Sequence, residues 1–103
     1  MNIGSLYKVK KWFWFLFPTK ETASEGEHLG GLIALGAAAH HDGVAAWYSK
    51  RFNCEVVCFP PDSIVVFLEE DGKLKKFLTS DGLVGWTWFN ESYNDCFEEV
   101  KHP

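Results

Sequence analysis

The dipeptides Asp71-Gly72 and Asp81-Gly82 constrain the fold more than any other feature of the sequence. Asp-Gly is favoured in tight β-hairpin turns, and apolar or alternating segments flank both dipeptides, at 64–68, 74–79 and 83–89. We therefore predict a three-stranded antiparallel meander. Each turn is expected to be a three-residue loop with its glycine, Gly72 or Gly82, in the left-handed backbone conformation.

Such loops set the register of the meander, because a slip of one residue would move every side chain to the other face. They pair Leu68 with Leu74 across the first turn and Leu78 with Val84 across the second. The other predicted pairs are Val66 with Lys76 and Leu74 with Trp88. The predicted inner face carries Ile64, Val66, Leu68, Leu74, Leu78, Val84, Trp86 and Trp88, with Lys76 as its polar member. The opposite face carries Val65, Phe67, Phe77, Thr79 and Thr87.

The segment before residue 18 contains the unbroken apolar run Trp12–Phe17. Residues 5–17 are predicted to form one long strand or two strands with a bend. A strand of consecutive apolar residues needs cover on both faces, since each large side chain left in water forgoes about 1.5–3 kcal/mol. The run therefore either crosses two layers of a small barrel or lies against another chain.

A stretch rich in glycine and alanine, residues 24–53, separates this segment from the meander. Ser24-Glu25-Gly26-Glu27 fits a capping box before the apolar stretch 29–35, although its glycines weaken a helix. Residues 43–52 form a better helix, with Asp42 as N-cap and Asn53 beyond the last turn. We expect strands at 55–59 and 97–101 as well.

Length and composition favour one domain, because 103 residues with 47% hydrophobic content suffice for a single core. We predict a mainly β (α+β) chain, residues 1–103 being a single domain. Its parts are a strand region at 3–17, a Gly/Ala-rich helical insertion at 24–53, and the meander with the last strand at 55–101.

Charge, hydropathy and cysteine content exclude several classes of protein. The net charge of −4 disfavours a general binder of nucleic acids or anionic membranes. The apolar stretches 12–17 and 29–39 are too short to span a bilayer. Three cysteines without an export signal indicate a reducing compartment, so we expect a cytoplasmic protein.

The C-terminal half resembles the SH3-like small barrels. The run Gly82-Leu83-Val84-Gly85-Trp86 is similar to the Gly-x-x-Gly-aromatic stretch of their last hairpin, and Tyr93 follows where they carry a Tyr on a 3₁₀ turn. The resemblance covers residues 62–101 and a first strand with Leu6-Tyr7, and implies an SH3-like barrel with a helical insertion between first strand and meander. It further implies a cyanobacterial or viral protein that serves in docking or assembly, in the cytoplasm or as a structural component of a phage particle.

The chain departs from that pattern in three places. No Pro follows the Gly-x-x-Gly-aromatic stretch, the acidic run expected in the first long loop is replaced by glycine and alanine, and no tandem aromatic opens the second meander strand. A polyproline-binding groove is therefore not implied.

The His and Cys residues suggest two chemistries. His28, His40 and His41 could join Cys54 and Cys58 in a zinc site, but the two cysteines are spaced as in a strand, not as in a zinc knuckle. Asn53-Cys54-Glu55 resembles the tripeptide around the nucleophile of lecithin–retinol acyltransferase-like enzymes. That cysteine opens a helix, which favours the thiolate, whereas Cys54 precedes a strand pattern. We expect neither an enzyme nor a metal or other cofactor, and identify no small-molecule substrate.

Aromatic residues carry the functional prediction. Nine Phe, five Trp and three Tyr are more rings than a small barrel can enclose, and interfaces are enriched in such residues. We predict a non-catalytic docking or assembly module whose partner is another protein or a second copy. The candidate contact residues are Trp12, Trp14, Trp47, Tyr48, Trp86 and Tyr93. Among these six, burial in the core is expected most of all for Trp86.

Nucleic-acid binding is the alternative, because lysines near the N-terminus and in the meander could meet on one surface and aromatic rings could stack with bases. The lysines are Lys8, Lys10, Lys11, Lys73, Lys75 and Lys76. Lysines on edge strands also protect against aggregation, and the net charge is negative, so this function ranks second.

Overall fold

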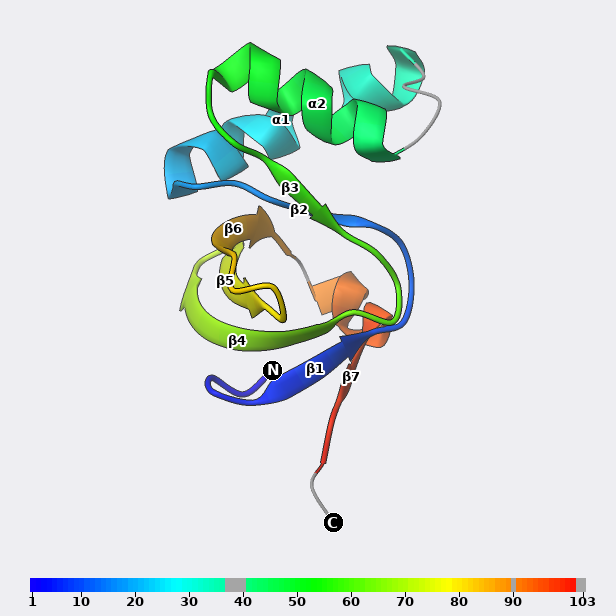
Figure 1. Cartoon of the computed structure of the whole chain (residues 1–103), viewed down its shortest axis with the longest axis vertical. Helices are drawn as coiled ribbons and strands as arrows, with labels where there is room; N and C mark the ends of the chain where they lie inside the picture. The colour runs from blue at the N-terminus through cyan, green and yellow to red at the C-terminus, as the bar shows by residue number, and fades with distance from the viewer. Residues whose placement is uncertain (37–40, 90, 102–103) are drawn as a thin grey trace.

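A computed structural model describes residues 1–36, 41–89 and 91–101. Within this part of the chain, antiparallel strands form a five-stranded sheet of order β6-β5-β4-β1-β7 and a two-stranded sheet of order β2-β3 (Figure 1). The strands are β1 (Leu6–Val9), β2 (Trp14–Leu16), β3 (Val57–Phe59), β4 (Ile64–Asp71), β5 (Leu74–Thr79), β6 (Val84–Trp88) and β7 (Phe97–Glu99). The helices are α1 (Lys20–Gly36), α2 (His41–Phe52) and the 3₁₀ helix η1 (Glu91–Cys96). The predicted mainly β (α+β) class is confirmed at this level.

The meander forms with both turn glycines in the left-handed region, at φ +59° for Gly72 and +84° for Gly82. The register across the second turn is confirmed, since Leu78 pairs with Val84 and Leu74 with Trp88. The register predicted across the first turn, with Leu68 opposite Leu74, is wrong.

Across that first turn, Val66 pairs with Leu78 and Asp71 pairs with Leu74. The pairing of Asp71 with Leu74 leaves two residues in the turn, so the predicted three-residue loop is wrong here. Farther from the turn, a β-bulge between Phe67 and Glu69 accommodates Leu68 and shifts the pairing by one residue. Bulges bend a strand and increase its twist, and β4 curves around β5 and β6 in Figure 1.

The predicted inner and outer faces of the meander are exchanged. Val65, Phe67 and Phe77 are fully buried, whereas Ile64 is 36% and Val84 49% exposed. The reason is what covers each face. The curved sheet bends around one face, where side chains of other strands pack. The helices pack on the other face near β6, as in Figure 1.

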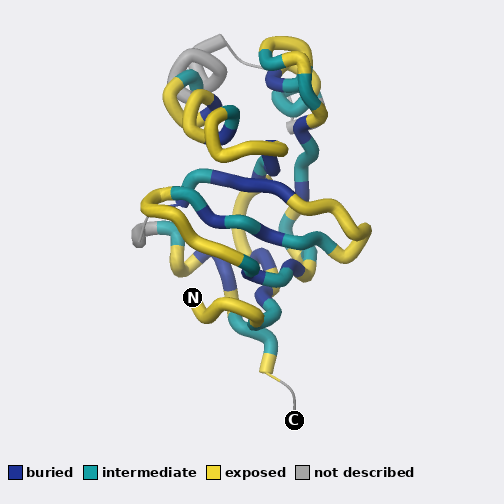
Figure 2. Tube along the Cα trace, turned by 90° about the vertical axis from the view of Figure 1, so that its left-hand side faces the viewer, coloured by how far each residue is buried: buried dark blue, intermediate teal, exposed yellow. Residues whose placement is uncertain are grey.

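Two clusters of buried side chains result. The inner cluster consists of Tyr7, Val9, Trp14, Leu16, Phe59, Val65, Phe67, Phe77, Phe89, Cys96 and Phe97. The helical cluster consists of Phe17, Ala23, Tyr48, Val56 and Trp86. Figure 2 shows buried stretches in the strands, while long exposed stretches follow the helices and the hairpin loops.

The N-terminal segment 5–17 forms two strands, β1 and β2, with a bend between them, which is one of the two predicted arrangements. Trp12 has φ 67° between β1 and β2. Beyond the bend, Trp14 and Leu16 join the inner cluster, and Phe15 and Phe17 contact the helical cluster. The same chain therefore covers both faces of β2.

Helix α1 begins four residues before the predicted capping box. Thr19 caps it, because its Oγ1 accepts a hydrogen bond of 3.1 Å from the backbone N–H of Thr22. Within α1, Gly26 lies against the ring of Phe17, and its carbonyl accepts a hydrogen bond of 3.0 Å from the Tyr48 hydroxyl of α2. The missing Cβ lets the helix approach β2 closely.

Helix α2 begins at His41, so Asp42 lies inside it and not at the predicted N-cap. Its end is as predicted, with Asn53 in the left-handed region at φ 50°. Strands β3 and β7 are shorter than the predicted 55–59 and 97–101. His40 and the end of the apolar stretch 29–39 lie outside the described residues.

Candidate functional site

A small aromatic groove lies between β2, β6 and η1 and has a volume of about 100 Å³. It is lined by Trp12, Phe13, Trp14, Phe15, Thr87, Trp88 and Tyr93. Strands β2 and β6 are edge strands of the two sheets and meet at the bridge between Phe17 and Trp86. The groove lies beside this bridge, where residues from the two edges face each other.

Three of the six predicted contact residues meet in the groove. The ring of Tyr93 lies 5.8 Å from that of Trp12 and 5.4 Å from that of Trp14, both in edge-on geometry. Trp12 is 59% exposed, while Trp14 is buried and donates a hydrogen bond of 3.0 Å from its indole Nε1 to the Lys11 carbonyl. Trp12 is therefore the accessible ring and Trp14 the fixed support beneath it.

The other three predicted residues lie away from the groove. Tyr48 and Trp86 are buried in the helical cluster, and Trp47 is 42% exposed on α2. Burial raises the pKa of the Tyr48 phenol to about 12, so its hydroxyl stays protonated as the donor to Gly26. Tyr48 and Trp86 are core residues that join the helices to the sheet, which confirms the expectation that Trp86 is buried.

Thr87 and Trp88 are groove residues that the sequence did not point to. Phe13 and Phe15 belong to the run Trp12–Phe17, for which contact with another chain was one of the two predictions. Trp88 was assigned to a packed inner face, and Thr87 carries no sequence pattern that distinguishes it. Their position follows from the antiparallel approach of β2 to β6, which brings together residues about seventy positions apart.

Thr87 is the polar residue of the groove. It is 1% exposed, and its Oγ1 has no hydrogen-bond partner among the described residues. A buried hydroxyl without a partner costs free energy, because it gives up hydrogen bonds to water. Thr87 therefore lowers the stability of the strand that lines the groove.

Thr87→Val is expected to raise the free energy of unfolding by about 1 kcal/mol, because the substitution removes an unsatisfied polar atom and nearly keeps the shape. Urea unfolding followed by tryptophan fluorescence measures the change. The matched control is Thr79→Val in the neighbouring strand. Its hydroxyl accepts a hydrogen bond of 3.2 Å from the Leu83 N–H, so that variant should lose stability. Equal losses in both variants would contradict the assignment.

Cys54, Cys58 and Cys96 form no disulfide bond in the part of the chain that the structure describes. Burial raises the pKa of Cys54 and of Cys96. Cys54 follows the C-terminal end of α2, where its backbone N–H donates to the Ser49 carbonyl at 3.2 Å. A thiolate is stabilised by a helix N-terminus or by a neighbouring cation. Cys54 instead follows a helix C-terminus.

The residues of the considered zinc site are not brought together in the part of the chain that the structure describes. Within that part, no group of three or more His, Cys, Asp or Glu side chains is placed to hold a metal ion. His40 is outside the described residues. Nor is any described helix long and apolar enough to cross a membrane.

Four of the six lysines of the nucleic-acid alternative lie near carboxylates. Lys10 contacts Glu98 at 2.8 Å, which raises the pKa of Lys10 and lowers that of Glu98. Lys8 lies 3.6 Å from Asp62. Lys76 lies 3.6 Å from Glu69, and Lys75 is buried beside Glu70. Strand β4 separates β1 from β5, so the two groups of lysines are on strands that are not neighbours.

Comparisons with protein-family models, curated proteins and solved structures find no match to this chain.

Proposed function

We propose that this chain is a non-catalytic docking module that binds an extended segment of a partner protein in the aromatic groove. The observation that carries the proposal is the exposed ring of Trp12 at a groove that is otherwise lined mainly by aromatic side chains.

The exposed rings favour a protein partner. Trp12 is 59% and Phe13 38% exposed. Many other aromatic side chains of this chain are buried in the inner and helical clusters. Exposed aromatic residues that adjoin a pocket are typical of binding hot spots, where one anchor side chain enters the pocket and neighbouring contacts exclude water.

The size of the groove indicates what enters it. Pockets for small molecules usually measure about 300–1,000 Å³, whereas this groove measures about 100 Å³. It suits one apolar side chain of a peptide.

The strand edges favour an extended partner. Edge strands expose backbone N–H and C=O groups that an added strand can pair with. Strands β2 and β6 each present an edge at the groove. A partner segment in extended conformation would pair with such an edge while its anchor side chain enters the groove.

The fold that we propose for this module is an SH3-like barrel with a helical insertion. Support comes from the strand that starts within the Gly82–Trp86 stretch and from Tyr93 on the 3₁₀ helix η1 before the last strand. The insertion contributes α1 and α2, which pack near β6 on the side away from the inner cluster.

The experiment is a selection of linear peptides from a random displayed library against the purified chain, followed by titration of synthetic peptides monitored by the indole N–H signals in NMR spectra. We expect the selected peptides to share one large apolar residue in an extended context. The indole signals of Trp12, Trp14 and Trp88 should shift on binding, and that of Trp47 should not.

Trp12→Ala is the decisive variant, and Trp47→Ala is its matched control, since both remove an exposed indole. Loss of an anchor ring costs about 2 kcal/mol or more, so Trp12→Ala should weaken binding about thirtyfold with an unchanged thermal unfolding temperature. Trp47→Ala should bind as the unmodified chain does. A library that yields no binder, or binding that depends on Trp47 and not on Trp12, would overturn the proposal.

A further inference from the structure

The backbone of Trp88, the last residue of β6, faces away from its own sheet. In an antiparallel pair, the N–H and C=O groups of successive residues point alternately toward the partner strand and away from it. Just beyond β6, the Phe89 N–H donates to the Lys73 carbonyl at 2.6 Å, which directs Phe89 toward β5. Thr87, two residues earlier, points the same way. The N–H and C=O of Trp88, which lies between them, therefore point away from β5.

The neighbouring bridge shows the same alternation. The N–H and C=O of Trp86, two residues before Trp88, both form hydrogen bonds with Phe17 of β2, on the side away from β5. In β2, the backbone groups of Phe15 point to the same side as those of Phe17, two residues later. The backbone groups of Phe15 and Trp88 are therefore directed toward each other, and these two residues are the next pair in register after Phe17 and Trp86.

The ladder between β2 and β6 nevertheless stops after one pair. Phe17 and Trp86 form an isolated bridge, and no main-chain hydrogen bond joins Phe15 to Trp88. Both of these residues line the aromatic groove instead. The two strand edges separate here, so the N–H and C=O of Trp88 face the groove without a hydrogen-bond partner in the part of the chain that the structure describes.

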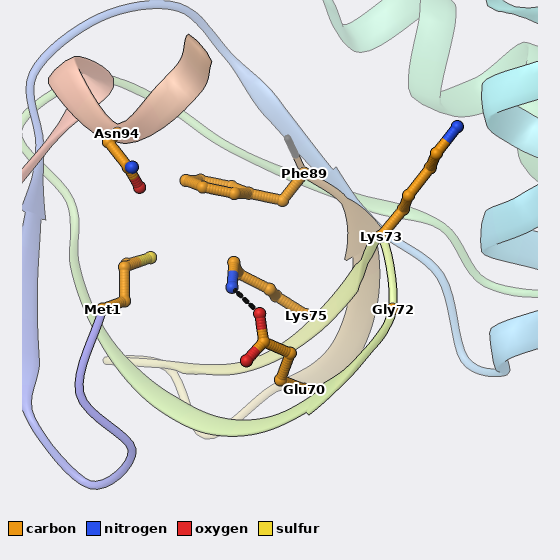
Figure 3. A pocket seen from close by; sticks show the side chains of 7 residues that line it. All are labelled: Met1, Glu70, Gly72, Lys73, Lys75, Phe89 and Asn94. Atoms are coloured by element: carbon orange, nitrogen blue, oxygen red, sulfur yellow. Dashed lines mark hydrogen bonds and ion pairs between the residues drawn. The ribbon is translucent and has the colours of Figure 1, made fainter. Parts of the chain in front are cut away.

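The end of β6 is held in place from its inner side. Figure 3 shows the side chains of Phe89 and Lys75 close together in the lining of a second cavity, which has a volume of about 390 Å³. The ring of Phe89 lies 5.4 Å from that of Phe97 and 5.9 Å from that of Trp14, and the Lys75 ammonium lies 5.1 Å from its centre. These contacts fix the strand, so Trp88 presents its backbone groups in a conformation that needs no rearrangement to accept a further strand.

We propose that the partner segment adds to β6 as a strand and exchanges main-chain hydrogen bonds with Trp88. This pairing rests on the docking function proposed above and identifies which part of the partner is recognised. When a peptide adds to an exposed sheet edge, main-chain hydrogen bonds supply affinity and side-chain pockets supply specificity. The aromatic groove supplies the pocket for the anchor side chain, and Trp88 supplies one donor and one acceptor for the main chain beside it.

This mode of binding restricts the chemistry of the partner. The partner residue opposite Trp88 must carry an N–H, so it is not proline. The partner is therefore an extended segment with an apolar anchor residue and a free main-chain donor at the paired position. A proline-rich segment in the polyproline II conformation lacks such a donor wherever proline occupies that position.

Amide hydrogen exchange of the full chain tests the pairing. It is followed by NMR with and without a saturating amount of the tightest synthetic peptide from the displayed library. The Trp88 amide should exchange about tenfold more slowly or less in the complex, because its new hydrogen bond must open before exchange. The amide of Asp81, in the exposed hairpin loop at the other end of β6, is the control and should not change.

N-methylation of the same peptide, one residue at a time, removes one main-chain donor in each derivative. We expect a loss of affinity of about tenfold at the residue opposite Trp88 and little effect at its two neighbours, whose N–H groups point away. If the Trp12 indole signal shifts but the Trp88 amide exchanges as before, or if successive N-methyl positions have equal effects, main-chain pairing is overturned and the docking function stands.

Trp88→Pro removes the N–H from the chain itself, and Trp88→Ala is its matched control, because it removes the same ring and keeps the N–H. Proline is tolerated in an edge strand where the N–H faces away from the sheet. Trp88→Pro should bind the peptide about tenfold more weakly than Trp88→Ala does, and equal affinities would contradict the pairing. If Trp88→Pro does not fold, amide exchange and N-methylation decide. A library without a binder would overturn the docking function and the pairing together.

Discussion

Gly85→Ala is expected to lower the free energy of unfolding by about 3 kcal/mol, the upper end of the usual cost of overpacking. A Cβ atom at this position would lie 2.8 Å from the Cβ of Leu16 and 2.8 Å from the carbonyl oxygen of Phe17. The position of each of these two atoms is set by the backbone of residues 16 and 17. Neither atom can therefore move aside by a change of rotamer.

The same crossing contains the bridge that joins the two sheets. The Phe17 N–H donates to the Trp86 carbonyl at 2.8 Å, and the Trp86 N–H donates to the Phe17 carbonyl at 2.7 Å. An alanine at 85 pushes these strands apart, so both hydrogen bonds weaken along with the packing of the helical cluster. The aromatic groove beside the bridge should widen as well.

Urea unfolding followed by tryptophan fluorescence measures the loss, and Gly72→Ala is the matched control. Nothing lies within 4 Å of a Cβ at Gly72, and its φ of +59° costs an alanine about 1–2 kcal/mol. Equal losses for the two variants would mean that the close approach of β2 to β6 is not the reason for glycine at position 85.

Phe77→Ala is expected to destabilise the chain by about 3–5 kcal/mol, the range for removing a buried phenylalanine. Its ring is fully buried and packs against three other rings. The ring centres of Phe97, Phe67 and Phe59 lie at 5.6, 5.7 and 6.2 Å. A cavity at this point would remove one packing neighbour from each of these three rings.

Val84→Ala is the matched control for Phe77→Ala, because Val84 lies in the next strand on the opposite face of the same sheet. It is 49% exposed, so its truncation should cost about 0.5 kcal/mol or less. The contrast decides which face of the meander forms the core. A larger loss for Val84→Ala than for Phe77→Ala would restore the face that the alternation of residues predicted.

Local features of the fold were predictable from the sequence because they depend on neighbouring residues. Asp-Gly turns, the left-handed Asn53 after α2 and the Tyr93 turn each reflect backbone preferences of a few residues. The length of the first hairpin loop was not predictable in this way. The structure combines a turn shorter than predicted with a bulge at Leu68, and neither depends only on the residues of the turn.

The candidate groove was predictable in part. An excess of aromatic residues pointed to a pool that includes Trp12, Trp14 and Tyr93, which do meet. Composition could not distinguish these from Tyr48 and Trp86, which the helices bury. Which of these rings are buried depends on where α1 and α2 pack against the sheet. That packing joins segments that are distant in sequence.

The sequence by itself determined the strands of the meander, its turns and the need to cover both faces of the run Trp12–Phe17, because these follow from backbone preferences and from the cost of exposing apolar surface. Only the tertiary structure decided which face of the meander is the core and which rings stay exposed. It also decided that Thr87 and Lys75, cross-strand partners on one face, become a buried hydroxyl and a buried ammonium. Burial is a property of what packs on a residue, and for these residues that cover comes from segments far along the chain.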